Sequence, residues 1–185
     1  MIDTAPTESN LSGLDRKNFQ KNINSKKTDL YILKNALGME VAVTNYGCAI
    51  LSIMVPDKNG KYANVILGHD SIEHVINSPE PFLSTTVGRY GNRIANGKFT
   101  LYGEEHQLTV NNGPNSLHGG PTGFHARVWD AVQPNESTVI FNYTSADGEE
   151  GFPGTLEVEM TYRLEDETNA PVSYTHLTLP TNSLV

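Results

Sequence analysis

The sequence predicts an all-β protein built as an antiparallel β-sandwich. Short apolar stretches recur between turn signals, and several alternate apolar with polar residues, which is typical of strands with one buried face. The 16 glycines and 10 prolines among 185 residues favour a turn-rich chain over a helix bundle. No long stretch carries a helical period, which argues against strands that alternate with helices.

The first half of the chain predicts a leader and then strands. Residues 1–18 are polar and without period, and we expect a flexible leader there. Four strands are expected next, at 29–33, 40–43, 49–55 and 65–67. Asn59-Gly60, between the last two, is a strong hairpin signal. The one expected helix covers Ser71–Ile76, with Asp70 or Ser71 as its N-cap. Cys48 is expected to be a buried small apolar residue.

The second half predicts further strands and then a change of character. Strands are expected at 98–102, at 106–110 and around Val139, Phe141 and Tyr143. Leu156–Leu164 has the clearest alternation, with five apolar residues on one face. We therefore expect the domain to cover residues 19–170. Residues 171–185 contain two prolines and no charged side chain, so we expect a poor return strand and an atypical tail, such as a sequencing or assembly artefact.

Composition narrows the classes of partner. A formal net charge of −8 disfavours a nucleic-acid or anionic-membrane partner, because binding phosphates requires clustered Lys and Arg. A single cysteine excludes an internal disulfide and a cysteine-based zinc site. No apolar run is long enough to cross a membrane as a helix. The first ten residues lack a signal peptide's features, so the expected location is the cytoplasm, or the periplasm if an export signal precedes residue 1.

Two segments carry residues suited to binding or catalysis. Residues 88–97, G-R-Y-G-N-R-I-A-N-G, combine two Arg, two Asn and three Gly, which suits polyhydroxyl ligands or carboxylates. The alternative is a turn whose arginines make structural salt bridges. Residues 112–124 contain His118 followed by Gly119-Gly120, a turn that can place an imidazole for hydrogen bonding or proton transfer. The alternative is a histidine that only caps this turn.

A third segment and four histidines are weaker candidates for binding or catalysis than the two segments above. Residues 147–154, D-G-E-E-G-F-P-G, could supply a general base or bind a cation, although a solvated turn is the alternative that we favour. The remaining candidate histidines lack the spacing of metal ligands, and we expect surface or satisfied core residues. They are His69, His74, His106 and His125.

Together these segments resemble the galactose mutarotase (aldose 1-epimerase) family. The resemblance covers Phe19 to Asp166 and rests on five motifs in order. They are T-N-Y-G-C-A-I at 44–50, V-I-L-G-H-D at 65–70, G-R-Y-G-N-R-I-A-N-G-K-F at 88–99, N-S-L-H-G-G at 115–120 and D-G-E-E-G-F-P-G-T-L at 147–156. The family implies a supersandwich fold and no cofactor. It also implies a small-molecule partner, a free aldohexose such as galactose or glucose, whose α and β anomers are interconverted by acid–base ring opening and closure.

The resemblance assigns roles to three residues and leaves two roles unfilled. It implies that Asn92 and Arg93 bind sugar hydroxyls and that His118 is a supporting donor at the ring oxygen. The family's principal acid, a His, and its base, a Glu, lie further along than the matched region. His176 in Y-T-H-L lacks the family's surrounding residues, and we do not assign the acid to it. We therefore expect the N-terminal part of a truncated epimerase, inactive alone. A non-catalytic carbohydrate-binding module of the same fold and a sandwich that binds nothing are the alternatives.

Overall fold

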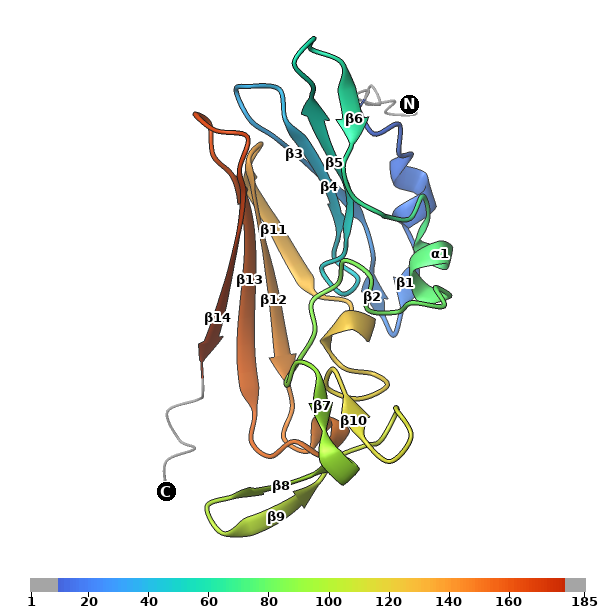
Figure 1. The fold of residues 1–185 in the computed structure, drawn as a ribbon, viewed down its shortest axis with the longest axis vertical. Coiled ribbons are helices and arrows are strands. Elements are labelled where there is room, and N and C mark those ends of the chain that lie inside the picture. Colours follow the sequence, from blue (N-terminus) through green and yellow to red (C-terminus); the bar gives the residue numbers. More distant parts are fainter. Residues whose placement is uncertain (1–9, 179–185) are drawn as a thin grey trace.

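The computed structural model describes residues 10–178 and contains two four-stranded antiparallel sheets that face each other (Figure 1). The first sheet, in the order β3-β4-β5-β6, comprises β3 (Leu30–Lys34), β4 (Glu40–Thr44), β5 (Ile50–Pro56) and β6 (Tyr62–Asn64). The second, in the order β11-β12-β13-β14, comprises β11 (Asp130–Asn135), β12 (Thr138–Ser145), β13 (Leu156–Leu164) and β14 (Pro171–Thr178). Neighbouring strands in both sheets are antiparallel, so the predicted sandwich is confirmed.

The main core fills the space between the two sheets. Val41 and Val43 of β4 belong to one buried cluster with Phe141 of β12 and Val158 of β13. Each contributes about 1.5–3 kcal/mol when fully buried, which makes this layer the principal source of stability. The alternation predicted for 156–164 is confirmed, since its apolar side chains point into this core. Cys48 is completely buried in the same cluster, as expected.

A second layer covers the outer face of the first sheet. The short 3-10 helix η1 (Arg16–Phe19) and helix α1 (Ile72–Ile76) lie on the side opposite to β11–β14, beside the small hairpin of β1 (Asn22–Ile23) and β2 (Lys26–Lys27) (Figure 1). Phe19 and Ile72 pack there against Ala42 of β4, which is buried on both faces. The predicted cap of α1 is confirmed, because Ser71 Oγ accepts a hydrogen bond from the His74 amide at 3.3 Å.

Residues 10–18 differ from the expected flexible leader. The amide groups of Leu11 and Ser12 donate hydrogen bonds of 2.8 and 3.1 Å to Oε1 of Glu40, whose side chain is fully buried. Phe19 at the end of η1 is also fully buried. Buried backbone-to-carboxylate bonds hold this segment against β4, a contact that sequence periodicity does not show. Residues 1–9 of the expected leader lie outside the described residues.

Residues 171–178 also differ from expectation, because they form the return strand that their composition disfavours. β14 pairs with the whole of β13, from Leu164 opposite Pro171 to Glu157 opposite Thr178. Ser173 and Thr175 hydroxyls contact the Met160 sulfur at 3.3 and 3.4 Å, so small polar side chains suffice on this strand. As the outermost strand of the sheet, β14 does not require an apolar residue at every second position. Residues 179–185 lie outside the described residues.

Two predicted strands are shifted, each because of its turn. The Asp57 side chain accepts amide hydrogen bonds from Asn59 and Lys61, so pairing resumes at Tyr62 and not at 65–67. Similarly, β8 (Lys98–Leu101) and β9 (Glu104–Gln107) are joined by two residues with positive φ, Tyr102 and Gly103, instead of a longer turn before residue 106. Two-residue turns of this kind match the twist of a hairpin.

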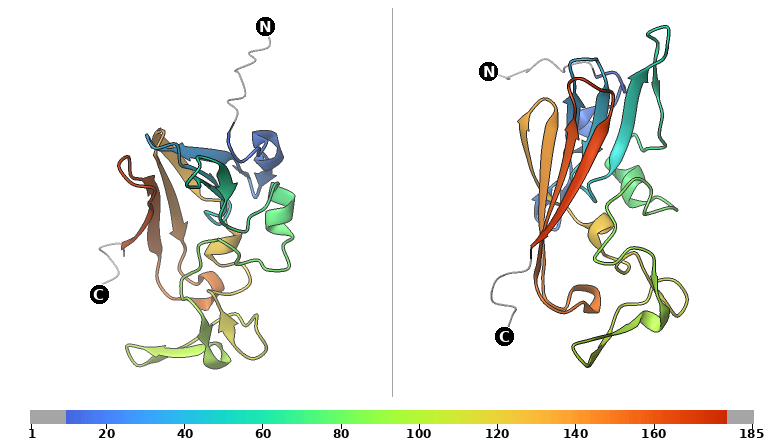
Figure 2. Two further views of the ribbon diagram at one scale, coloured as in Figure 1. Left: turned by 45° about the horizontal axis from the view of Figure 1, so that its top comes forward. Right: turned by 60° about the vertical axis from the view of Figure 1, so that its left-hand side comes forward.

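A small lobe extends from one end of the sandwich. Figure 2 shows the β8–β9 hairpin there together with β7 (Arg93–Ile94) and β10 (Ser116–Leu117), far from the β5–β6 turn. β7 and β10 come from the two sequence segments that suggest binding, while Phe124 at the end of the second segment belongs to the main core. Within residues 10–178, no helix is long and apolar enough to cross a membrane.

Candidate functional site

The short strands β7 and β10 bring the two binding segments together. Arg93 pairs with Leu117 and Ile94 with Ser116 in an antiparallel register. His118, the next residue, donates its amide hydrogen to the carbonyl oxygen of Asn92 at 3.0 Å. The three residues predicted for binding thus lie in adjacent positions across one two-stranded pairing.

The His118 ring is oriented by the backbone of Asn92. The Asn92 amide donates a hydrogen bond of 2.9 Å to Nδ1 of the ring. A ring nitrogen that accepts a hydrogen bond carries no proton, so the neutral imidazole carries its proton on Nε2. Asn92 has a φ of 67° and His118 a φ of 53°, left-handed conformations that asparagine and, less often, histidine adopt. The pairing leaves Nε2–H as a directed donor at the end of β10.

The Arg93 side chain is anchored and still retains donors. Its Nε donates to Oδ1 of Asn112 at 2.9 Å, and its Nη1 donates to Oδ1 of Asn92 at 3.2 Å. Guanidinium has five N–H groups, so three are not used in the hydrogen bonds that the structure gives for residues 10–178. Because the two amide oxygens fix the plane of the guanidinium, the remaining donors have a defined direction. This arrangement suits a ligand with several neighbouring oxygen atoms.

Arg89, four residues earlier, has a different environment. All five of its N–H groups donate, at 2.7–3.0 Å, to Ser145 Oγ and to the carbonyl oxygens of Ser145, Ala146, Pro153 and Gly154. Burial lowers the pKa of this guanidinium, partly opposed by the charges of Glu149 and Asp147. Arg89 therefore has the structural role that the sequence left open, although carbonyl oxygens and not carboxylates are its partners.

A cavity of about 510 Å³ adjoins these residues. Two arginines line it together with aromatic and aliphatic groups. The lining residues are Arg89, Tyr90, Arg93, Ile94, Phe99, Leu101, Phe152 and Pro153. Its volume is in the range of small-molecule sites, and it shares Arg93 with the Asn92–His118 pair.

Comparison with known proteins identifies the family of the chain. The profile of the aldose 1-epimerase family matches residues 29–182. The chain is 39% identical over 145 residues to aldose 1-epimerase of Escherichia coli K12, and 42% identical over 127 residues to galactose mutarotase of Bos taurus. The chain belongs to the aldose 1-epimerase family. These matches cover 78% and 69% of the chain but only 42% and 36% of the two relatives, so the chain spans less than half of their length.

Solved structures agree with the aldose 1-epimerase assignment. A crystal structure of an aldose epimerase homologue from C. elegans superposes with a TM-score of 0.78 at 31% identity, covering 83% of this chain and 47% of that one. Galactose 1-epimerase from Lactobacillus acidophilus NCFM superposes with a TM-score of 0.69, also at 31% identity, covering 80% and 43%. The sandwich is therefore the mutarotase-type fold that the motifs predict.

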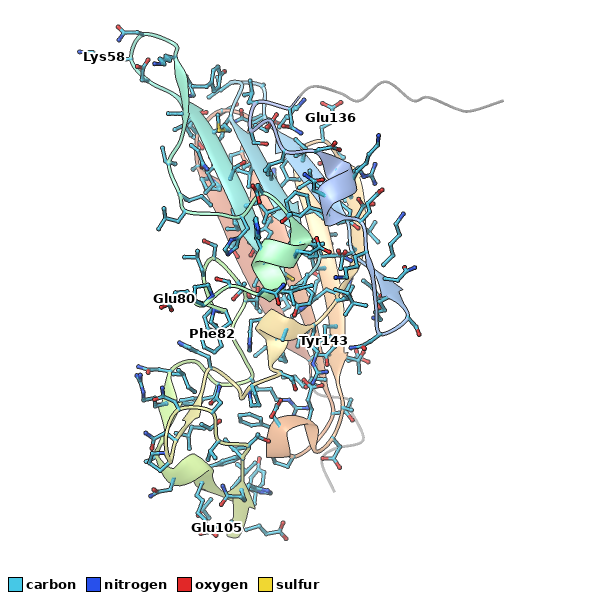
Figure 3. All side chains as sticks on the ribbon, turned by 90° about the vertical axis from the view of Figure 1, so that its right-hand side faces the viewer. Lys58, Glu80, Phe82, Glu105, Glu136 and Tyr143 are labelled. Carbon is cyan, nitrogen blue, oxygen red and sulfur yellow. The ribbon has the colours of Figure 1, made fainter. Side chains whose placement is uncertain are left out.

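Two aromatic residues of this epimerase-family chain were not predicted as neighbours of the site. The ring of Phe82, which is labelled in Figure 3, has its centroid 4.7 Å from that of the His118 ring and 4.4 Å from that of the His125 ring, so it packs against both imidazoles. His125 is only 4% exposed, and burial lowers its pKa to about 4, with the charge of His118 as the next cause. It is a core residue, as expected, but its Nδ1 has no hydrogen-bond partner among the described residues. A single phenylalanine without periodicity gives no sequence signal of such a contact.

The other candidate histidines lie in places that the sequence allowed. His74 is exposed and pairs with Asp70 at 2.6 Å, and His106 packs on Phe99 at 5.1 Å. His176 is exposed on β14 opposite Glu159, and His69 is half-buried. Within residues 10–178, no three His, Cys, Asp or Glu side chains gather as metal ligands would.

The acidic 147–154 turn is engaged with the protein and is not simply solvated. Glu149 accepts a hydrogen bond of 2.5 Å from the Tyr143 hydroxyl, and Asp147 accepts one of 2.5 Å from the Gly154 amide. Burial, followed by the bond to Glu149, raises the pKa of Tyr143. Glu150 accepts hydrogen bonds from both the amide, at 2.8 Å, and the hydroxyl of Thr122. The three carboxylates thus hold loops in place.

Proposed function

We propose that Asn92, Arg93 and His118 bind a free aldohexose such as galactose or glucose, as part of an aldose 1-epimerase site. The observation that carries this proposal is the reciprocal hydrogen bonding of Asn92 and His118, which leaves His118 Nε2–H as a donor, together with the bond from the Arg93 guanidinium to Oδ1 of the same Asn92. Sugar hydroxyls donate and accept hydrogen bonds, and the ring oxygen accepts them. Complementary groups are available on all three residues: the side-chain amide nitrogen of Asn92, the remaining N–H donors of Arg93 and Nε2–H of His118.

The proposed reaction is mutarotation by ring opening and closure. A base removes the proton from the anomeric hydroxyl while an acid protonates the ring oxygen, and the bond between C1 and that oxygen breaks. The new carbonyl group rotates, and the same steps in reverse close the ring on its other face. A hydrogen bond from His118 Nε2–H to the ring oxygen supports this step by stabilising the negative charge that develops there. Each positioned acid or base typically contributes about 10²–10⁴-fold to the rate.

The principal acid and base are proposed to lie outside residues 10–178. Two carboxylates of the acidic 147–154 turn, Glu149 and Glu150, already accept hydrogen bonds from Tyr143 and Thr122. His118 Nδ1 is occupied by the Asn92 amide, so this ring cannot accept a proton there without losing that bond. We therefore expect this chain alone to bind the sugar without accelerating mutarotation.

The test combines binding and turnover on the same samples. D-galactose is titrated into the folded chain and followed in ¹H–¹⁵N spectra, while polarimetry of freshly dissolved α-D-galactose measures turnover. Arg93→Ala and His118→Ala are each expected to weaken binding about tenfold or more, as the loss of a charged or directed hydrogen bond predicts. Arg163→Ala is the matched control, because this arginine is exposed on the outward face of β13.

The outcomes test separately the sugar-binding residues and the placement of the acid and base. Binding that is lost in both site variants and kept in the control supports the assigned residues. A folded wild-type chain that shows no galactose binding contradicts the site. Acceleration of mutarotation by the chain alone contradicts the placement of acid and base outside residues 10–178. Binding without turnover by a chain extended to the relatives' full length would indicate the carbohydrate-binding module instead.

A further inference from the structure

The loop that follows His118 has little room and an unusual backbone. Gly119 and Gly120 have φ values of +85° and +97°, which other residues adopt only with strain. A Cβ on Gly119 would lie 1.6 Å from the carbonyl oxygen of Gly88. His118 itself has a positive φ, and conformations of this kind persist only where the surroundings impose them. Contacts outside the loop must therefore hold it.

One of these contacts is the pairing with Asn92 at the start of the loop. The other is the carboxylate of Glu150 at its end. Glu150 Oε1 accepts the Thr122 amide at 2.8 Å and the Thr122 hydroxyl, and Oε2 lies 2.7 Å from the point where a Cβ on Gly120 would stand. The carboxylate thus covers Gly120 and is bonded to the residue two positions later.

Further contacts hold the backbone of Glu150 and join the Thr122 loop to the neighbouring Glu149. Its carbonyl oxygen accepts the Thr109 amide at 3.0 Å. Arg127 Nη2 donates to the Thr122 hydroxyl at 3.4 Å and lies 3.7 Å from a Glu149 carboxylate oxygen, which ties the same loop to the acidic turn. Glu150 is half-buried, whereas Thr122 is exposed. Removal of the carboxylate would leave the His118 loop fixed at its start and at the buried Phe124 that follows it, while Thr122 would keep only its weak contact with Arg127 and the turn at residues 119–122 would loosen.

We propose that Glu150 is a positioning residue of the candidate sugar site, whose carboxylate holds the Gly119–Thr122 turn and thereby the orientation of the His118 ring. The proposal rests on the proposed function for its effect on sugar binding. The effect on the ring itself can be measured without any sugar. Glu150 acts through Thr122 and His118 and is not proposed to touch the ligand.

The experiment compares Glu150→Ala with Glu150→Gln in the 185-residue chain. The first readout is the pair of imidazole ¹⁵N signals of His118 near neutral pH. In the wild type these should be widely separated, because the Asn92 amide fixes the proton on Nε2. In Glu150→Ala they should move toward each other as both tautomers become populated, and galactose affinity should fall about tenfold. Glu150→Gln keeps an oxygen acceptor for Thr122 and should remain within about threefold of wild-type affinity, with separated signals.

Two further variants keep the test decisive. Glu149→Ala removes the neighbouring carboxylate, which is bonded to Tyr143 and reaches Thr122 only through the weak Arg127 contacts, and should lower stability with a much smaller effect on the His118 signals than Glu150→Ala. If Glu150→Ala does not fold, Thr122→Val keeps the amide bond to Glu150, removes the hydroxyl's bonds to Glu150 and Arg127, and should shift the ring signals in the same direction. Unchanged His118 signals in a folded Glu150→Ala or Thr122→Val variant would overturn the proposal.

The same measurements separate this proposal from the proposed function. Shifted His118 signals in a protein whose wild type binds no galactose would support the positioning role and contradict the sugar site. Galactose binding of wild-type strength in Glu150→Ala, together with unchanged ring signals, would support the sugar site and overturn the positioning role.

Discussion

Replacement of Arg89 by alanine should destabilise the fold, whereas the same replacement of Arg93 should not. Arg89 donates five hydrogen bonds to the 145–154 segment, and Arg93 donates two to exposed side chains. A hydrogen bond to a charged group contributes about 1.5–3 kcal/mol, but the five are not additive and water can reach some of the released carbonyl groups. We expect a loss of about 3 kcal/mol for Arg89→Ala and less than about 0.5 kcal/mol for Arg93→Ala.

The assay is urea and thermal unfolding followed by tryptophan fluorescence. Trp129 is the single tryptophan, is fully buried and lies 5.3 Å from the Tyr143 ring, at the end of the sandwich that Arg89 ties together. For a chain of this size, 3 kcal/mol corresponds to a fall in Tm of about 6–12 °C. Arg89→Lys should recover less than half of this, because an ammonium cannot span the five acceptors. Equal losses in Arg89→Ala and Arg93→Ala would refute the division of roles between the two arginines.

Two other substitutions test buried ionisable groups. Glu40→Ala should lower the free energy of unfolding in urea by about 2 kcal/mol and allow rapid hydrogen exchange at the Leu11 and Ser12 amides. Glu40→Gln keeps the acceptor and should retain most of the protection from exchange. Slow exchange of both amides in the alanine variant would argue against the contact. His125 has a folded pKa of about 4 against 6.5 unfolded, so the unfolded chain binds the proton first and stability should fall as the pH drops from 6.5 toward 4. Between pH 7 and pH 5 the free energy of unfolding should fall by about 1–2 kcal/mol through His125. His125→Gln should remove this part of the pH dependence, and an unchanged pH profile in the variant would contradict the prediction.

The sequence predicts those parts of the fold that follow from local patterns. Leu156–Leu164 has the bounds of β13, because its alternation continues along the whole strand. The strands at 65–67 and 106–110 were misplaced, because turns at Asp57 and Tyr102 decide where pairing resumes. β14 was missed because an outermost strand beside Met160 tolerates threonine and serine where an inner strand requires apolar residues.

Local sequence patterns likewise predicted only part of the candidate site, because the rest depends on contacts between distant segments. Asn92, Arg93 and His118 could be selected because their motifs are recognisable, and their close approach then required the β7–β10 pairing. Sequence alone could not distinguish Arg89 from Arg93, since the acceptors that occupy Arg89 lie 56 or more positions away. The contact of Phe82 with two imidazoles likewise depends on tertiary packing that no local pattern encodes.

The two-residue strands that carry the site have a consequence for how the molecule opens. β7 and β10 share only two paired positions, whereas β12 and β13 share eight. Short pairings near the surface open at a small fraction of the free energy needed for global unfolding. We therefore expect the β7–β10 pairing to open more readily than the sheets of the sandwich. A ligand held by Asn92, Arg93 and His118 would bind the paired state, so substitutions that change how readily this pairing opens should change affinity while the sandwich keeps its stability.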